Sequence, residues 1–306
     1  MSINIIEKKV KSSDGIHTLV GKVYLPKGEP KAYLHVVHGM EEHIGRYDRF
    51  MRVAAENGYI CFGYDHLGHG LTAQPTRDFG YIADKDGWLR LCQDVEFFSS
   101  AVRAEYGSGL PYYLMGHSMG SFIVRAASEM YVNPDKLIIM GTGGPMALSA
   151  FGLGLVKLNK KIYGGKHCSK FVYLTVFSSY NDHFKKENDT RSWLSSIKEE
   201  RDRNRDDEFC RIKFTIGGME DLLRLQRFVN RKAWFSALPA ELPIFLVAGS
   251  DDPVGSYGKG VTKVYNLLKE NGKNAEMKLY PGCRHEILND TSREEVTGDI
   301  LTFLEG

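Results

Sequence analysis

The sequence predicts an α/β protein with a mostly parallel central sheet, flanking helices and one helical insert. Three observations predict this class. Short apolar runs alternate with longer mixed segments over residues 33–140, the alternation stops over residues 145–235, and it resumes after Pro239. Strands separated by helices form parallel βαβ units, whose sheet is covered by helices on both faces.

The predicted strands are short runs rich in β-branched and aromatic residues. In chain order they are Tyr33–His38, Tyr59–Tyr64, Tyr112–Met115, Lys136–Met140, Leu242–Ala248 and Ala275–Tyr280. The predicted helices are Tyr47–Asn57, Asp84–Tyr106, Met119–Met130, Tyr257–Glu270 and Glu294–Leu304. Gly58 and the pair Asn271-Gly272 are expected to stop the helices that precede them.

The insert predicts the domain organisation. Residues 1–144 and 236–306 are expected to form one core, and residues 145–235 a helical cap, or lid, inserted into it. Two independent domains fit less well, because neither flank would hold a complete sheet. The insert starts with the apolar stretch Ala147–Val156, and its charged run Lys198–Arg211 is expected to form a solvated helix face.

Composition and charge exclude several classes of protein. The 306 residues carry 40 Lys and Arg against 38 Asp and Glu, so there is no basic field to attract nucleic acid. The 42% hydrophobic content is too high for a disordered chain, and no apolar run approaches the ~18–20 residues that span a bilayer. We therefore expect a folded protein with no nucleic-acid partner.

The cysteines and the first residues predict the compartment. The cysteines are odd in number and far apart, without a C-x-x-C pair: Cys61, Cys92, Cys168, Cys210 and Cys283. This pattern argues against a disulfide framework and a thiolate metal site. The start MSINIIEKKV lacks the pattern of a signal peptide, so a cytoplasmic protein with reduced thiols is expected.

One pentapeptide predicts a nucleophile. Gly116-His117-Ser118-Met119-Gly120 is the single G-x-S-x-G of the chain, directly after a predicted strand and before a predicted helix. A serine on such a sharp turn projects its hydroxyl at the carboxyl end of the sheet. Gly116 and Gly120 avoid clashes with the neighbouring strand and helix. The N–H groups at the helix start face developing negative charge.

A serine hydroxyl needs a base, and two later loops supply candidates. His285 follows the strand Ala275–Tyr280 and is the only histidine after His183. Asp251 and Asp252 follow the strand Leu242–Ala248. The residues alone leave the acid open: one aspartate orients the imidazole, while the other caps the helix that follows.

The oxyanion hole needs two N–H donors. Met119, directly after the nucleophile, supplies one. The other is expected from the loop His38-Gly39-Met40, which follows the first predicted strand. Met40 N–H is the best candidate, with Gly39 letting the backbone turn into the site. Glu42 and His43 are interpreted as structural supports of this loop, and a direct substrate role for Glu42 is the alternative.

Together these residues resemble the α/β-hydrolase superfamily, in its monoacylglycerol lipase and lysophospholipase branch, the serine aminopeptidase group. The resemblance covers nearly the whole chain. It rests on five motifs in family order, namely His38-Gly39-x-x-Glu42-His43, Asp65-His66-x-Gly68-His69-Gly70, Gly116-His117-Ser118-Met119-Gly120, Gly249-Ser250-x-Asp252 and Gly282-x-x-His285.

The resemblance implies roles for individual residues. It makes Ser118 the nucleophile, Asp252 the acid and His285 the base, with Met40 and Met119 as oxyanion donors. The loop residues that support them are His38, Gly39, Gly116, His117 and Gly120. Related lipases carry a small residue at the Met40 position, so the bulkier methionine is expected to narrow or reshape the acyl entrance.

The implied activity is hydrolysis of carboxylic esters, with monoacylglycerols or lysophospholipids as small acyl-ester substrates. An amidase or aminopeptidase acting on small peptides is the alternative within the fold, and a non-catalytic binding protein is the rival of another class. No cofactor or metal is expected. The two histidines of Asp65–Gly70 have no third ligand in register, and a turn beneath the active site is the preferred interpretation.

The front of the insert leaves one partner open. Its lysines lie among apolar residues: Lys157, Lys160, Lys161, Lys166 and Lys170. A solvated lysine-rich face is the commoner interpretation, and transient contact with a membrane surface is the alternative. The sequence does not predict an oligomeric state.

Overall fold

The computed structural model describes residues 3–145 and 149–306. Its eight-stranded sheet has the order β1-β2-β4-β3-β5-β6-β7-β8. The strands are β1 Asn4–Lys11, β2 Thr18–Leu25, β3 Ala32–Val37, β4 Tyr59–Tyr64, β5 Tyr112–His117, β6 Lys136–Met140, β7 Ile244–Gly249 and β8 Ala275–Tyr280. β2 pairs antiparallel with β1 and β4, and all the other pairs are parallel.

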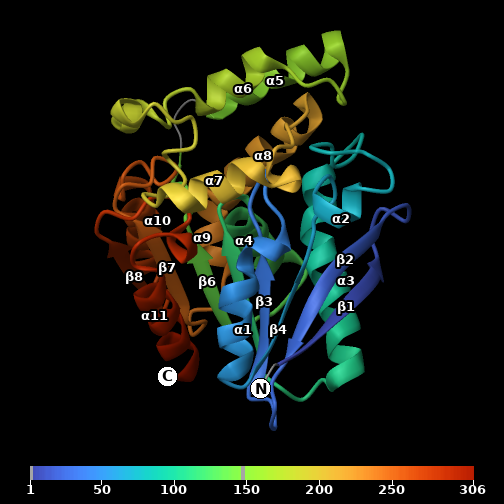
Figure 1. Ribbon diagram of the computed structural model, residues 1–306, viewed down its shortest axis with the longest axis vertical. Helices are drawn as coiled ribbons and strands as arrows, with labels where there is room; N and C mark the ends of the chain where they lie inside the picture. Colours follow the sequence, from blue (N-terminus) through green and yellow to red (C-terminus); the bar gives the residue numbers. More distant parts are fainter. Residues whose placement is uncertain (1–2, 146–148) are drawn as a thin grey trace.

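Helices cover both faces of this sheet (Figure 1). α1 Asp48–Glu56 and α11 Arg293–Glu305 pack on one face, against side chains such as Leu34 and Ile138. α3 Gly87–Tyr106, α4 Met119–Met130 and α10 Lys259–Glu270 pack on the other, against side chains such as Tyr33 and Leu137. Neighbouring residues of one strand thus belong to opposite cores, as the two-residue period of a strand requires.

All six predicted strands and all five predicted helices are present. The parallel strands β3, β4 and β7 are buried along their whole length, which explains why they read as continuous apolar runs. Gly58, with φ of 95°, follows α1, and Gly272, with φ of 70°, follows α10. These left-handed backbone conformations favour glycine and end the helices as expected.

The sequence interpretation missed the hairpin of β1 and β2 and the short helix α2 Gly70–Ala73. β1 lies at the edge of the sheet and has no buried residue within Asn4–Lys11. Its sequence NIIEKKVK therefore lacks the apolar run of an internal strand. α2 spans four residues, too few for a helical period to be recognised.

The predicted insert holds helices and no strand among its described residues; residues 146–148 lie outside them. The elements are α5 Ser149–Tyr163, α6 Lys170–Phe177, η2 Asp182–Glu187, α7 Lys198–Asp206, η3 Glu208–Cys210, α8 Ile216–Val229 and α9 Lys232–Ala237. α5 to α8 lie together above one end of the sheet (Figure 1). That these segments form a unit separate from the core stays a prediction.

The charged run Lys198–Arg211 differs from expectation in one respect. The solvated face is real, but Glu200, Arg201 and Asn204 of α7 are buried. Arg201 donates from Nε to Asp189 at 2.9 Å, and from Nη1 to the carbonyl of Ser195 at 2.9 Å. The run therefore also provides buried contacts that join α7 to the segment 189–195 within the insert.

Among the described residues, no helix is both long and apolar enough to cross a membrane.

Candidate active site

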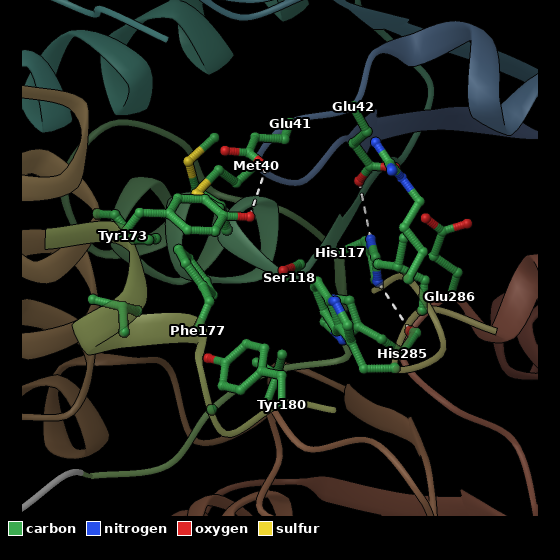
Figure 2. A pocket seen from close by; sticks show the side chains of 18 of the residues that line it. Met40, Glu41, Glu42, His117, Ser118, Tyr173, Phe177, Tyr180, His285 and Glu286 are labelled. Carbon is green, nitrogen blue, oxygen red and sulfur yellow. Dashed lines mark hydrogen bonds and ion pairs between the residues drawn. The ribbon is translucent and has the colours of Figure 1, made fainter. Parts of the chain in front are cut away.

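Ser118 lies on a strained turn between β5 and α4. Its φ of 54° and ψ of −119° are costly for a residue with a side chain. Its N–H donates to the carbonyl of Met140 at 3.0 Å, which ties the turn to β6. In Figure 2 the Ser118 side chain lies between two groups of residues that line a cavity of about 450 Å³.

The two glycines of the turn are required by space. A Cβ on Gly116 would lie 2.3 Å from the carbonyl oxygen of Gly120, and a Cβ on Gly120 would lie 2.1 Å from that of Val37. Both distances are below any real contact, so a larger residue would push the helix away from the sheet. The glycines thus let α4 start close to β3 and β5.

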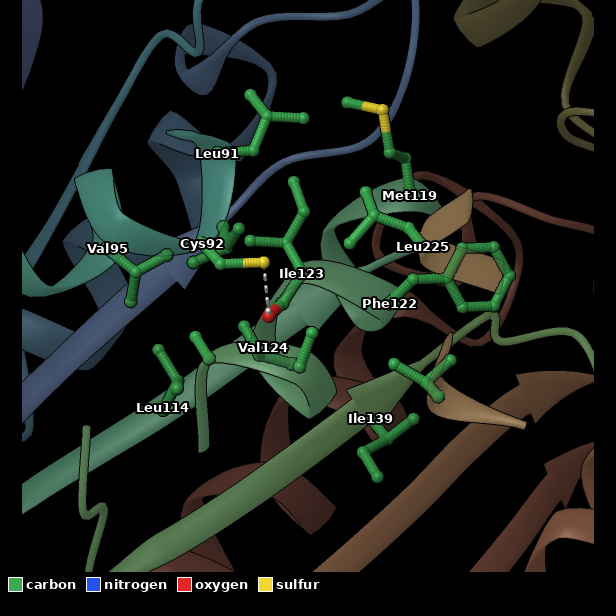
Figure 3. Packing of buried hydrophobic residues seen from close by; sticks show 14 of the residues in the cluster. Leu91, Cys92, Val95, Leu114, Met119, Phe122, Ile123, Val124, Ile139 and Leu225 are labelled. Carbon is green, nitrogen blue, oxygen red and sulfur yellow. Dashed lines mark hydrogen bonds between the residues drawn. The ribbon is translucent and has the colours of Figure 1, made fainter. Parts of the chain in front are cut away.

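Apolar packing fixes α4, the helix that follows Ser118. Figure 3 shows Ile123 facing Cys92 of α3, and Phe122 and Met119 next to Leu225 of α8. These residues belong to one buried cluster. Because Met119 is the first residue of α4, helix geometry leaves its N–H without a partner inside the helix.

His285 and Asp252 meet beneath the cavity. Nδ1 of His285 lies 2.9 Å from Oδ2 of Asp252, and both residues are buried. The other oxygen of Asp252 accepts the N–H of Val254 at 2.8 Å. Asp251 instead accepts the hydroxyl of Ser250 at 2.8 Å. The contact with His285 therefore belongs to Asp252, the residue that the family resemblance favours.

The expectation that one aspartate caps the next helix is wrong. α10 begins at Lys259, after Gly258 with φ of 81°, and has no side-chain cap. Residues 253–258 separate the aspartates from this helix, so neither carboxylate reaches its first N–H groups.

A buried ion pair joins the loop that carries Glu42 to the turn that carries Ser118. Glu42 accepts the N–H of Gly39, the hydroxyl of Tyr47 at 2.8 Å and Nδ1 of His117 at 3.0 Å. On the other side of its ring, Nε2 of His117 lies 3.1 Å from the carbonyl of His285. Both ring nitrogens of His117 thus face acceptors, which favours the doubly protonated imidazolium.

The pKa values of this pair move in the corresponding directions. Burial alone raises the pKa of Glu42, but the hydrogen bond and charge of His117 outweigh it and lower the pKa to about 2. Burial alone lowers the pKa of His117, but the bond and charge of Glu42 raise it above its usual value. Two loops that are far apart in the sequence are therefore linked by a charged hydrogen bond.

Neutral histidines lie beneath the loop His38-Gly39-Met40. His66 N–H donates to Nε2 of His38 at 3.0 Å, and Nε2 of His66 lies 3.1 Å from the carbonyl of His38. Burial lowers the pKa of His66 to about 3 and that of His69 to about 4, so both rings are uncharged at neutral pH. The motif Asp65–Gly70 is thus a turn that carries the loop.

One group of potential metal ligands occurs within residues 3–145 and 149–306. Atoms of His43, Asp207 and Cys210 lie within 4.8 Å of one another. A hydrogen bond of 2.8 Å between His43 Nε2 and Asp207 accounts for part of this proximity. Burial raises the pKa of the Cys210 thiol, which keeps it protonated and a poor ligand.

The cavity has an apolar wall and a polar wall. The apolar wall comes from α4, α6 and α8 and includes Phe122, Leu174, Val176, Phe177, Leu222 and Leu223. The polar wall includes Glu42, His117, Asn181, Asn204, His285 and Glu286. Met40 also lines the cavity. Such a cavity suits a ligand with a hydrocarbon part and a polar part.

The apolar residues of the insert, Trp193 and Tyr173 among them, are predicted from the sequence to form an acyl or aromatic pocket, but the sequence does not place either beside a particular residue of the site. The Trp193 ring lies 5.1 Å from the His285 ring, and its carbonyl accepts the His285 N–H at 3.3 Å. Tyr173 lines the cavity too, and so does Glu41, which the sequence analysis did not single out. Trp193 and Tyr173 lie in an insert without a recognisable motif. Glu41 lies in the motif His38-Gly39-x-x-Glu42-His43, but at a position where the motif specifies no residue.

Comparison with known proteins now adds the family. Residues 28–292 match the family model described as serine aminopeptidase, S33. The chain belongs to this family. It is 28% identical to human monoglyceride lipase over 95% of this chain and 86% of that protein, and 25% identical to the monoacylglycerol lipase of Mycolicibacterium smegmatis over 94% and 92%.

Solved structures with the same fold are also similar to this chain. A thermostable carboxyl esterase from Bacillus coagulans, in complex with glycerol, superposes with a TM-score of 0.93 at 29% identity, covering 100% of this chain and 99% of that one. A monoglyceride lipase from Saccharomyces cerevisiae superposes with a TM-score of 0.77 over 99% and 95%; at 19% identity it shows the fold alone. The predicted fold and family are confirmed, and the chain is an α/β-hydrolase that resembles monoglyceride lipases and esterases.

Proposed function

We propose that this protein is a carboxylic ester hydrolase that cleaves monoacylglycerol- or lysophospholipid-type esters through Ser118, His285 and Asp252. The observation that carries the proposal is the His285–Asp252 hydrogen bond of 2.9 Å beside a strained serine turn in one cavity. The apolar wall of that cavity fits an acyl chain. The names of the relatives, which are lipases and esterases, support the same substrate class.

In the proposed mechanism each side chain has one step. Asp252 holds the proton on Nδ1 of His285, which leaves Nε2 free to take the proton of Ser118. The serine oxygen then attacks the ester carbonyl, and the N–H groups of Met40 and Met119 stabilise the oxyanion. His285 protonates the leaving alcohol, and water repeats the sequence on the acyl-enzyme to release the acid.

The insert is assigned as a cap. Residues 145–235 would cover the site while residues 1–144 and 236–306 form the core. The described part of the cap exposes large apolar side chains on α5 and α6, namely Phe151, Leu158, Ile162, Tyr163, Phe171 and Leu174. These side chains, next to lysines, suit transient contact with a membrane surface that holds lipid substrate.

Replacement of Ser118 tests the mechanism. Ser118→Ala is expected to lower turnover of a short p-nitrophenyl ester by about 10⁴-fold or more and to abolish labelling by a fluorophosphonate. Ser236→Ala, on an exposed residue of α9, is the control and should keep the wild-type rate. A Ser118→Ala variant that stays folded and turns over the ester at the wild-type rate would sink the mechanism.

A matched pair of variants tests the acid. Asp252→Asn is expected to lower turnover by about 10³–10⁴-fold, because the amide no longer stabilises the charged imidazole. Asp251→Asn, one residue away, should stay within about threefold of wild type. Esters should be cleaved in preference to aminoacyl naphthylamides; the opposite preference would favour the aminopeptidase alternative.

A further inference from the structure

Glu41 brings an additional carboxyl group to the cavity that the mechanism above does not use. Figure 2 shows Glu41, Met40 and Tyr173 on one side of Ser118, and His117, His285 and Glu286 on the other. The φ of Glu41 is 56°, a left-handed conformation that is uncommon for a residue other than glycine. The backbone of this loop thus adopts an unfavourable conformation at the residue that carries the carboxyl group.

Two donors from the cap region hold the carboxyl group. Its Oε1 accepts the N–H of Phe214 at 3.2 Å, and its Oε2 accepts the hydroxyl of Tyr173 on α6 at 3.3 Å. Each carboxylate oxygen can accept about two hydrogen bonds, so each keeps room for a further donor. A ligand in the cavity can supply it, because Glu41 is partly accessible and lines the cavity wall.

The charge on Glu41 is balanced differently from that of its neighbours. Of the other carboxylates that line the cavity, Glu42 is bonded to His117, and Glu286 is paired with Arg46. The two donors that hold Glu41 are uncharged. The cations Arg191 and Lys213 act on Glu41 through their charges, and among the described residues its carboxylate oxygens are hydrogen-bonded to Phe214 and Tyr173. The carboxylate oxygens are therefore available to a ligand at the wall beside Met40.

We infer that Glu41 is a specificity-determining residue, which favours esters carrying an ammonium or hydroxyl donor beside Tyr173 and disfavours esters carrying an anion there. This role rests on the proposed ester hydrolysis. The fold alone does not distinguish monoacylglycerol-type from lysophospholipid-type esters, but Glu41 would. Its carboxylate would repel an anionic phosphate, whereas it would accept a hydrogen bond from a neutral polyol or attract a cation.

The selection should depend on pH. Burial raises the pKa of Glu41 to about 7, although Phe214 N–H, the Tyr173 hydroxyl, Arg191 and Lys213 act in the opposite direction. On the remaining side, the Glu41 N–H lies 3.4 Å from Nε2 of His69, whose pKa is lowered to about 4. Burial raises the pKa of Tyr173 above its usual value. Near neutral pH, then, Glu41 changes charge while His69 stays neutral and Tyr173 stays protonated.

A set of matched esters measures the selection. Three p-nitrophenyl acyl esters of equal length end in an ammonium, a methyl or a carboxylate group. A second set places the charge on the alcohol: butyrate esters of choline, of its uncharged analogue 3,3-dimethylbutanol and of a hydroxycarboxylate. Within a set the scissile ester is the same, so ratios of kcat/KM cancel the pH dependence of the chemical step.

In one of the two sets the variable group binds beside Tyr173. For that set, the kcat/KM of wild type should be about 30-fold higher for the ammonium ester than for the carboxylate ester near pH 8, where Glu41 is ionised. Near pH 6, where Glu41 is mostly protonated, this ratio should be about threefold. Glu41→Gln should lower the ratio to about threefold at both pH values. Tyr173→Phe keeps the carboxyl group but removes a bond that favours its ionised form, so the midpoint of the ratio against pH should rise. Such a shift separates a charge effect from damage to the fold.

The outcomes separate the two proposals. If both methyl and charged esters are cleaved and the Glu41→Gln ratio equals that of wild type in both sets, the role of Glu41 is overturned and ester hydrolysis stands. If no ester of either set is cleaved, ester hydrolysis fails, and the role of Glu41 fails with it. A wild-type ratio that stays constant between about pH 6 and pH 8 also overturns the role.

Discussion

The two walls of the cavity are built on different principles. The polar wall, which carries His285, is held by the buried guanidinium of Arg284, which donates to the carbonyls of Ser192 and Ser195 and to the exposed carboxylate of Glu187. The apolar wall is built from aliphatic and aromatic side chains of α4, α6 and α8. On α6 it has exposed apolar side chains on its outside, such as Phe171.

The comparison teaches which part of the site needs fixed geometry. A base must point at its serine within tenths of an ångström, and directional hydrogen bonds achieve that where packing alone does not. An acyl chain can be accommodated by many arrangements of apolar side chains, so its wall needs only shape. Accordingly, Arg284 in the His285 loop is bonded to Glu187, Ser192 and Ser195 of the insert.

Arg284→Met should break this contrast most strongly. The variant leaves the Ser192 carbonyl without the donor that Arg284 supplies and loses the contact of the guanidinium with the Phe184 ring at 4.0 Å. The Ser195 carbonyl and the Glu187 carboxylate also lose Arg284 but keep their contacts with Arg201. We expect a loss of about 3 kcal/mol in the free energy of unfolding, measured in urea.

Arg52→Met is its control, because Arg52 and Asp48 form a solvent-exposed pair within α1. It should cost less than about 1 kcal/mol. Equal losses in the two variants would show that the Arg284 contacts hold the polar wall no better than a surface pair does.

Glu42→Gln should change how the free energy of unfolding depends on pH, because Glu42 belongs to the charged pair on the polar wall. The pKa of Glu42 is lowered from 4.5 to about 2 in the folded state. Ionised Glu42 therefore stabilises the fold fully above its unfolded-state pKa of 4.5, and this stabilisation is lost as the pH falls towards 2. The pKa of His117 is raised above 6.5, so its contribution is present below 6.5 and is lost as pH rises through the raised value. The pair therefore stabilises the fold most between about pH 5 and pH 6.5.

Between about pH 5 and pH 6.5 we expect the free energy of unfolding of wild type to exceed that of Glu42→Gln by about 2 kcal/mol. Urea unfolding of both proteins at a series of pH values measures this difference. The gap should narrow on both sides. The exposed Glu208, replaced by Gln, gives the background. A gap that does not vary with pH would mean that Glu42 acts as a neutral acceptor only.

The smallest effect on stability is expected at exposed apolar side chains of the insert. Phe151 is 72% exposed and Ile162 62% exposed, so replacing both by Ser should change the free energy of unfolding by less than about 0.5 kcal/mol. Co-sedimentation with anionic lipid vesicles should nevertheless fall severalfold. Ile16→Ser, in the turn between β1 and β2 and also 72% exposed, should not change it. Equal vesicle binding by all three proteins would remove the membrane proposal.

Local patterns in the sequence predicted most of the core. The strands β3, β4 and β7 were predictable because burial on both faces makes each a continuous apolar run, whereas β1, at an edge of the sheet, has no such run. Position in the sheet is not the whole reason, because the internal strand β2 was missed and the edge strand β8 was predicted. Ser118 and His285 were predictable as candidates because each occurs in a short motif directly after a predicted strand. Trp193 and Tyr173 lie in an insert whose helical pattern says nothing about which side chains face the cavity.

The sequence by itself determined the fold class, the family, the candidate nucleophile and the candidate base. Only the tertiary structure decided that Asp252 rather than Asp251 touches His285, that Glu42 pairs with His117, and that Glu41 lines the cavity. The physical reason is range. Strands, turns and motifs depend on neighbours in the chain, whereas these contacts join segments far apart in the sequence, and their burial and charge exist only after the sheet and the cap have assembled.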